Sequence, residues 1–401
     1  MSKPALIYAD NNATTPVAPE VAAAMQPYFG PEFFNPSSMY EPALQVAGAL
    51  KAARKTVAQF LGGVDVSEVL FTSCATESNN AAIFGAAAAN PKRKHIVTSV
   101  VEHPAVLEVC REMQRRGHEV TFLPVNRQGQ IATADYVRAL RPDTLLVSLM
   151  HANNETGVLW PVGEWARIAK ETDPGIVFHT DATQTAGKLP LDLSGELKHV
   201  DLLSFSGHKM HAPKGVGVLY VRRGTPLRPY LLGGHQEAGR RGGTENVPYI
   251  VGLARACELA REHAPDMARI EKLRDGLEAE ILRTVTHVEV NGRGVARMPN
   301  TLNLACHFIE GESILYELNG YGICASTGSA CSSGSLEPSH VLKAMAVPFT
   351  AMHGSVRLSF SAYTTAAEVQ RSAEIFPKVV ASLRNMSPYW DQKHNRPREN
   401  A

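Results

Sequence analysis

The chain has 401 residues, 44% of them hydrophobic and 20% charged, an ordinary composition for a globular protein. Its 40 Lys and Arg nearly balance its 39 Asp and Glu, so charge gives no argument for a nucleic acid or an anionic membrane as partner. The sequence shows neither a secretory signal nor the roughly 18-residue apolar run of a membrane helix, and we expect a cytoplasmic protein.

Short β-branched and apolar runs alternate with segments rich in Ala, Glu, Arg and Leu from about residue 41 to 220. The expected strands cover residues 69–72, 95–100, 120–123, 145–150, 176–180, 202–206 and 216–220. This rhythm predicts an α/β domain with a mainly parallel central sheet and helices on both faces. Ligand sites in such sheets lie in the loops beyond the carboxyl ends of the strands.

The second half of the chain predicts a smaller α+β domain. A helical segment over residues 247–285 would link it to the first domain, and its expected strands cover residues 301–306 and 355–360. We expect a large cofactor-binding domain at residues 15–260 and a small domain made of residues 1–14 and 261–390. The Ser-, Gly- and Ala-rich residues 325–339 predict a mobile loop, and the polar residues 391–401 predict a disordered tail.

Three local patterns indicate a cofactor site. A Ser-Gly-His-Lys turn after a strand ends at Lys209, where partial desolvation and nearby cations lower an amine's pKa and favour Schiff-base chemistry. Asp181 ends another strand and could hold a pyridinium nitrogen protonated, and residues 72–78 could seat a phosphate at a helix start. Taken singly, these are as readily a surface lysine, a helix cap and a simple helix start.

Together and in this order, the three patterns resemble the fold-type-I pyridoxal-phosphate enzymes. Within that fold, the chain resembles the class V aminotransferase family and, more narrowly, its cysteine desulfurases of group I. The matching stretches run from residues 8–16 to residues 387–390 and so span nearly the whole chain. The resemblance implies pyridoxal 5′-phosphate as cofactor, L-cysteine as substrate and L-alanine as product.

The resemblance also implies roles for individual residues. Lys209 would bind the cofactor covalently, Asp181 would hold its ring nitrogen, and Gln184 would donate to its ring hydroxyl. The family further implies contacts with the phosphate (Ala75, Thr76, Ser206 and His208, with Thr244 from a neighbouring subunit), the ring (His103 and Asn154) and the substrate carboxylate (Asn35 and Arg357). A homodimer with shared active sites would follow, and His103 would also move protons.

Cys331 lies in the Ser/Gly-rich segment, where a core position is not expected. The chemistry needs a thiolate that reaches the substrate sulfur and carries it away as a persulfide, and a mobile loop supplies both travel and exposure. The alternative is an exposed loop cysteine without a function. The segment resembles the desulfurases that serve iron–sulfur assembly, closest to the nitrogenase-associated type. An iron–sulfur scaffold protein would then accept the sulfur. No metal is required, although Cys331 could ligate an iron–sulfur cluster transiently.

Two positions depart from the family pattern. Phe34 stands where the family usually has Gly beside Asn35, and Cys74 lies inside the phosphate motif in place of a small residue. Other functions on the same fold are a selenocysteine lyase and an aminotransferase, of which the aminotransferase needs no loop thiol. A non-catalytic iron–sulfur scaffold is the alternative from another class, and it predicts loss of Lys209 or Asp181, which are both present.

Overall fold

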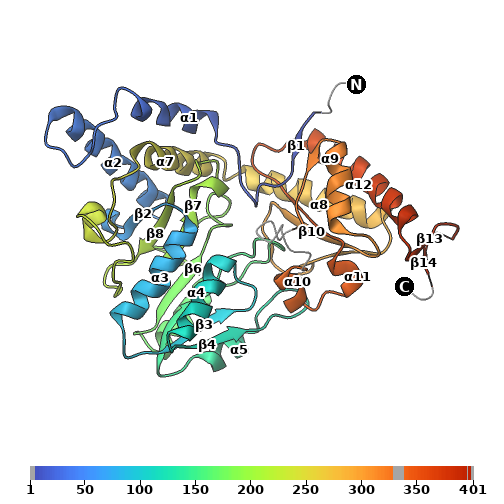
Figure 1. The fold of residues 1–401 in the computed structure, drawn as a ribbon, viewed down its shortest axis with the longest axis horizontal. Coiled ribbons are helices and arrows are strands. Elements are labelled where there is room, and N and C mark those ends of the chain that lie inside the picture. Colours follow the sequence, from blue (N-terminus) through green and yellow to red (C-terminus); the bar gives the residue numbers. More distant parts are fainter. Residues whose placement is uncertain (1–4, 328–337, 395, 399–401) are drawn as a thin grey trace.

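The computed structural model describes residues 5–327, 338–394 and 396–398, and its ribbon forms two lobes (Figure 1). The strands are β1 (Ile7–Tyr8), β2 (Val69–Thr72), β3 (His95–Ser99), β4 (Glu119–Leu123), β5 (Thr144–Ser148), β6 (Val177–Asp181), β7 (Leu202–Ser206), β8 (Gly217–Val221), β9 (Val288–Val290), β10 (Thr301–Cys306), β11 (Ile323–Cys324), β12 (Ser355–Ser359), β13 (Trp390–Asp391) and β14 (Arg396–Pro397). The α-helices are α1 (Pro19–Met25), α2 (Glu41–Phe60), α3 (Ala75–Ala89), α4 (Pro104–Arg115), α5 (Thr133–Ala139), α6 (Val162–Thr172), α7 (Val247–Glu262), α8 (Asp266–Thr284), α9 (Gly311–Gly320), α10 (His340–Ala344), α11 (Phe349–Met352) and α12 (Ala366–Met386).

The first lobe is built on a sheet with the strand order β2-β8-β7-β6-β5-β3-β4. Neighbouring strands from β7 to β4 are parallel, whereas β8 is antiparallel to both β7 and β2. The predicted α/β fold with a mainly parallel sheet is therefore confirmed, and each predicted strand of this lobe lies within two residues of its predicted bounds. The carboxyl ends of the parallel strands share one edge, where the predicted cofactor residues come together.

Alternating side chains of these strands enter two different cores. Leu202 packs in a cluster with α3 and α4 on one face, while Leu203 packs in the cluster on the other face, which includes residues of α1, α2 and α7. Successive residues of a strand point to opposite faces, so strands covered by helices on both faces need continuous apolar runs. This burial explains why the sequence of this sheet is readable as a series of short apolar stretches.

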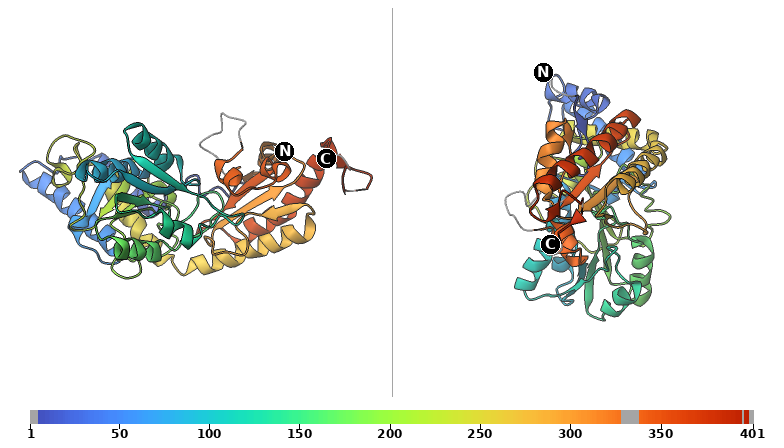
Figure 2. Two further views of the ribbon diagram at one scale, coloured as in Figure 1. Left: turned by 90° about the horizontal axis from the view of Figure 1, so that it is seen from below. Right: turned by 90° about the vertical axis from the view of Figure 1, so that its right-hand side faces the viewer.

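The second lobe has its own core. A sheet of order β12-β10-β9 packs against α8, α9 and α12, and the buried cluster there includes Leu304 and Leu358. Figure 2 shows α8 extending from the end of α7 along this lobe. These separate clusters support the predicted two-domain division, which stays a prediction. Within residues 261–390, however, Val341 and Leu342 of α10 pack in the core of the first lobe.

Two segments differ from the sequence predictions. The single helical segment expected over residues 247–285 is two helices, because Pro265 lies at the break between α7 and α8 and proline disfavours helical conformation in the preceding residue. The expected tail is partly structured over its described residues, where β13 pairs with β14. Trp390 is only 1% exposed and stacks on the guanidinium of Arg384, and this burial anchors the hairpin.

Candidate functional site

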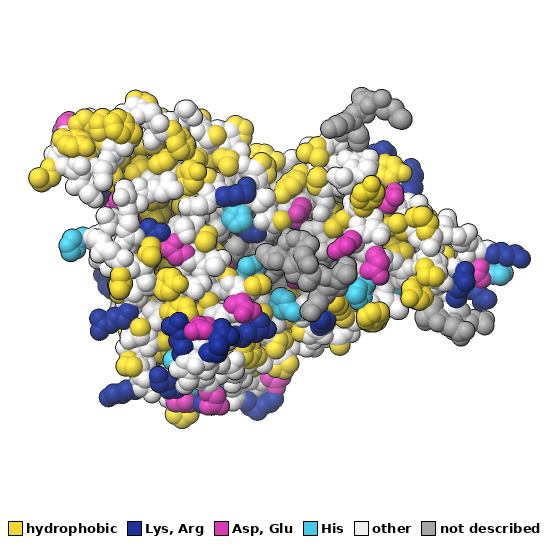
Figure 3. All heavy atoms as spheres, viewed as in Figure 1, with side chains coloured by type: hydrophobic (Ala, Val, Ile, Leu, Met, Phe, Trp, Pro, Cys, Tyr) yellow, Lys and Arg dark blue, Asp and Glu magenta, His cyan; other side chains and the backbone are white. Residues whose placement is uncertain are grey.

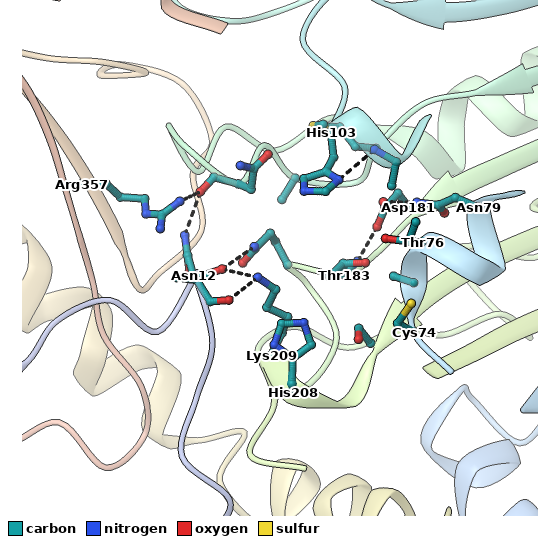
Figure 4. Close-up of a pocket in the computed structure, with 18 residues that line it drawn as sticks. Asn12, Cys74, Thr76, Asn79, His103, Asp181, Thr183, His208, Lys209 and Arg357 are labelled. Atoms are coloured by element: carbon teal, nitrogen blue, oxygen red, sulfur yellow. Dashed lines mark hydrogen bonds between the residues drawn. The ribbon is translucent and has the colours of Figure 1, made fainter. Parts of the chain in front are cut away.

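A cavity of about 260 Å³ lies at the carboxyl ends of the parallel strands (Figure 4). Most of the predicted site residues line it: Ala75, Thr76, His103, Asn154, Asp181, Gln184, Ser206, His208, Lys209 and Arg357. They come from loops that lie far apart in the sequence, so the fold rather than local spacing brings them together. Asn35 and Thr244 do not line the cavity, and Cys331 lies outside the described residues.

The amine of Lys209 points into this cavity. Lys209 ends a short 3-10 turn, Gly207–Lys209, directly after β7. Its Nζ donates hydrogen bonds to the main-chain carbonyl oxygens of Asn12 and Ala13, both at 2.7 Å. These two acceptors hold the amine between the loops of the first lobe and the chain segment that enters from the second lobe (Figure 4).

Asp181 ends β6 and is 7% exposed. Its Oδ2 accepts from the side-chain amide of Asn79 at 2.7 Å, and its Oδ1 accepts from the N–H of Thr183 at 2.9 Å. Asn79 lies on α3 and is fully buried, and the sequence analysis assigned it no role. Its donor fixes the orientation of the carboxylate, which is the group that would hold a pyridinium nitrogen.

The start of α3 forms one wall of the cavity, with Ala75 and Thr76 in its first turn. The first N–H groups of a helix lack intrahelical acceptors and favour an anion such as a phosphate. Nearby, Ser206 Oγ, Gln184 Oε1 and Thr183 Oγ1 are buried without a hydrogen-bond partner in the described part of the chain. Buried polar atoms normally find partners, so these three groups fit a polar ligand such as pyridoxal phosphate.

His103 is the N-cap of α4, and its Nδ1 accepts the N–H of Ala105 at 3.1 Å. This bond assigns the proton of the neutral ring to Nε2. Burial lowers the pKa of His103, the Lys209 and His340 charges lower it further, and the Asp181 charge opposes them. The ring is therefore neutral at physiological pH and presents its Nε2–H as a hydrogen-bond donor.

Arg357 lies in β12 and is 2% exposed. Its Nη1 donates to the carbonyl oxygen of Asn154 at 2.8 Å, and its Nη2 donates to Oδ1 of Asp10 at 2.8 Å. The guanidinium is thus oriented from two sides while it lines the cavity. Such a fixed, planar cation suits recognition of a carboxylate. Asp10 belongs to the motif over residues 8–16, but no local pattern predicts its contact with Arg357.

The two predicted residues outside the cavity lie on exposed loops. Asn35 accepts the N–H of Ser37 at 2.9 Å, and its neighbour Phe34 stacks on Phe33 with ring centroids 4.5 Å apart. The bulky residue at the position where the family usually has Gly therefore packs on another ring instead of entering the cavity. Thr244 lines a separate hollow that also contains Ser73, next to the start of α3.

The described residues on both sides of the Cys331 segment contact residues that line the cavity or adjoin it in sequence. Ser326 exchanges two main-chain hydrogen bonds with Arg357. The hydroxyl of Ser339 donates to Oε2 of the buried Glu155 at 2.5 Å, and Glu155 follows Asn154 in sequence. The chain therefore leaves the second lobe beside Arg357 and enters the first lobe beside Asn154.

The sequence matches the aminotransferase class-V family over residues 7–371. This chain therefore belongs to the aminotransferase class-V family. Its cavity brings together Lys209, Asp181 and the start of α3. Fold-type-I pyridoxal-phosphate enzymes share this architecture, with a mainly parallel sheet covered by helices.

Named relatives narrow the class to cysteine desulfurases. The chain is 53% identical over 387 residues to the cysteine desulfurase NifS of Azotobacter vinelandii, covering 96% of this chain and 95% of the relative. A solved NifS-like protein superimposes with a TM-score of 0.88 at 37% identity, covering 94% of this chain and all of that one. A structure titled SspA in complex with cysteine has a TM-score of 0.78 at 36% identity and covers 89% and 99% of the two chains.

Proposed function

We propose that this chain is a pyridoxal-phosphate-dependent cysteine desulfurase, which converts L-cysteine to L-alanine and transfers the sulfur to Cys331 as a persulfide. The observation that carries the proposal is the meeting of Lys209, Asp181 and Arg357 in one cavity with the start of α3. Cysteine desulfurases about 50% identical over 96% of the chain support the reaction class.

The residues of the cavity fit the cofactor. Ser206 Oγ, Gln184 Oε1 and the first N–H groups of α3 provide polar contacts, and Lys209 provides the amine that binds the aldehyde. Pyridoxal phosphate supplies an electron sink for an amino acid bonded to it. Asp181, oriented by Asn79, would hold a proton on the ring nitrogen and so maintain that sink.

The other residues act on the substrate. Arg357 binds the carboxylate of cysteine, and Nζ of Lys209 removes the Cα proton and later returns one. The Cys331 thiolate attacks the substrate sulfur, so that the S–S bond of the persulfide forms as the C–S bond of cysteine breaks. The electron pair of that bond stays with the carbon, which is protonated to give alanine. Neutral His103 presents its Nε2–H as a hydrogen-bond donor. Any step in which it moves a proton begins with accepting one, because release of the Nε2 proton would leave an imidazolate.

We further propose a homodimer in which Thr244 reaches the phosphate of the other subunit. Thr244 is exposed and lies outside the cavity of its own chain. Large hydrophobic side chains gather over α1 and α2 at the upper left of Figure 3. Exposed large hydrophobic side chains around these helices include Phe29, Phe33, Met39, Tyr40 and Leu44, and further ones, Tyr230, Leu231 and Leu232, follow β8. An exposed apolar surface of this kind is typical of a protein–protein interface.

The sulfur acceptor that we propose is an iron–sulfur scaffold protein, and the nitrogenase-associated role rests on the similarity to NifS. The transient ligation of an iron–sulfur cluster by Cys331 and the cytoplasmic location stay predictions. No helix of the described residues is both long enough and apolar enough to span a membrane.

The function is tested by incubating the holoprotein with L-cysteine and a reductant and measuring the products. We expect alanine and sulfide in equal amounts, with the cofactor fixed to Lys209 by borohydride in the wild type and not in Lys209→Ala. A keto acid from the amino-acid carbon would indicate an aminotransferase instead. Activity confined to selenocysteine would indicate a selenocysteine lyase, and a protein that never binds the cofactor would be the scaffold alternative.

A further inference from the structure

Asn12 occupies a central position in the cavity. It lies between Lys209 and Arg357 (Figure 4) and is 2% exposed. Asn12 belongs to the segment that leaves β1 and crosses from the second lobe to the first. It therefore contacts groups of both lobes at the point where they face the cavity.

The main chain of Asn12 holds the amine end of the site. Its carbonyl oxygen accepts from Nζ of Lys209 at 2.7 Å and from Nε2 of Gln184 at 3.1 Å. The next carbonyl, of Ala13, accepts from the same Nζ at 2.7 Å. A shift of this segment would move the carbonyl oxygens that hold the Lys209 amine and, with them, the acceptor of the Gln184 amide.

The side chain of Asn12 fixes that segment to the guanidinium end. Its Nδ2 donates to Oγ1 of Thr301 at 2.9 Å and to the carbonyl oxygen of Asn154 at 3.3 Å, and its Oδ1 accepts from Nδ2 of Asn300 at 3.0 Å. The same Asn154 oxygen accepts from Nη1 of Arg357 at 2.8 Å. Asn12 thus connects the Lys209 amine, which donates to its carbonyl oxygen, with the Arg357 guanidinium, which shares the Asn154 oxygen with its side chain.

We propose that Asn12 is a positioning residue that sets the location of the Lys209 amine relative to the guanidinium of Arg357, an inference that rests on the proposed function. A substrate held by its carboxylate at Arg357 presents its Cα at a defined place, and Nζ of Lys209 must reach that place to move the proton. A misplacement of 1 Å in such an arrangement can lower the rate by roughly a hundredfold.

The chain offers a matched control in Asn11. Asn11 is also 2% exposed, but its Nδ2 donates to the carbonyl oxygens of Tyr8 at 3.2 Å and Ser359 at 2.9 Å, and it does not line the cavity. Asn11→Ala and Asn12→Ala therefore remove the same buried amide from adjacent positions. They differ in whether that amide is connected to Lys209 and Arg357.

The experiment measures three properties of the wild type and both variants. The first is the Kd of pyridoxine 5′-phosphate, which has the phosphate and ring but no aldehyde, for the apoprotein. The second is the rate at which pyridoxal phosphate becomes fixable to Lys209 by borohydride, followed by mass spectrometry. The third is the pair of kcat and KM for L-cysteine. Thermal unfolding of each apoprotein reports the loss of stability.

We expect Asn12→Ala to slow covalent linkage and to lower kcat by about tenfold each, the effect of roughly one positioning hydrogen bond. Because Gln184 shares the Asn12 carbonyl, the Kd for pyridoxine 5′-phosphate should rise, but by less than the linkage rate falls. The kcat should change more than the KM. Asn11→Ala should lose similar stability while its linkage rate and kcat stay within about twofold.

Wild-type linkage and kcat in Asn12→Ala would overturn the proposal. Equal losses in both variants, in proportion to their lost stability, would overturn it as well. If Asn12→Ala does not fold, Asn12→Ser and Asn11→Ser provide the same comparison, because serine is uncharged and keeps a small polar group while it removes the amide. A wild-type protein that forms no link with pyridoxal phosphate would refute the proposed function instead.

Discussion

Lys188 is a buried amine whose removal should change stability in a pH-dependent way. Its Nζ donates to the main-chain carbonyl oxygens of Gln184 at 3.1 Å and Lys209 at 3.2 Å. Burial lowers the pKa of Lys188 from 10.5 to about 7, and the charges of Lys209 and Arg357 contribute. The folded chain therefore holds fewer protons at this site than the unfolded chain does between pH 7 and 10.5.

The magnitude of the change in Lys188→Met follows from this lowered pKa. One pKa unit corresponds to ~1.4 kcal/mol, so protonation of the unfolded chain destabilises the wild type by about 4 kcal/mol at pH 7. This penalty disappears as the pH rises through 10.5, where the amine is neutral in both states. Met removes the penalty but also two hydrogen bonds, each worth about 1 kcal/mol. We expect the variant to be more stable by about 2 kcal/mol at pH 7 and less stable by about 1 kcal/mol at pH 10.

The assay is the urea midpoint of the two apoproteins measured from pH 7 to pH 10.5. Titrations that Lys188 does not influence cancel in the difference, so the difference reports Lys188 together with the groups coupled to its charge. The wild type should gain stability relative to the variant as the pH rises, with the two curves crossing near pH 9, an estimate from the same linkage. Parallel curves over this range would refute the reasoning, because they would show that the amine has the same pKa in the folded and unfolded chains.

Two further substitutions test a buried carboxyl, that of Glu102, and the proposed carboxylate-binding residue, Arg357. Burial raises the pKa of Glu102 to about 8, so the folded chain binds more protons there than the unfolded chain between pH 4.5 and 8, and wild-type stability should fall as the pH rises through this range. Glu102→Gln should reduce the loss of stability between pH 5 and pH 8, measured as the difference between the urea midpoints at the two pH values. An equal loss in the variant and the wild type would show that Glu102 does not have a raised pKa. Arg357→Lys should raise the KM for L-cysteine about 10- to 100-fold in steady-state kinetics, since the planar fork that pairs with a carboxylate is lost. An unchanged KM would exclude Arg357 from carboxylate binding.

The sheet and the strand-end residues could be predicted because their signals are local. Leu202 and Leu203 belong to one short apolar run. Both residues are apolar because both faces of the strand are buried, so that successive side chains enter a core on one face or the other. Lys209 and Asp181 follow directly after such runs, so predicting the strands also placed these residues at the edge where ligands bind. The break before α8 was missed because the helical pattern on both sides of Pro265 is continuous.

The supporting residues of the site could not be predicted, because their contacts join distant parts of the chain. Asn79 forms a hydrogen bond with Asp181, 102 positions away in the sequence, and Asn12 forms one with Asn300, 288 positions away. No local pattern distinguishes a buried asparagine that orients a neighbour from one that only satisfies a turn. The nearest signal was the motif over residues 8–16, which contains Asn12 but suggested no role for it.

The claim that Cys331 receives the sulfur is tested most directly by Cys331→Ala. Both holoproteins are mixed with L-cysteine, and alanine is quantified in a single turnover while mass spectrometry monitors an added sulfur on the chain. The account predicts that the wild type gains one sulfur at Cys331 and forms alanine, whereas the variant still binds cysteine and forms neither product. Alanine released by the variant at the wild-type rate would contradict the account, because another group would then be breaking the C–S bond.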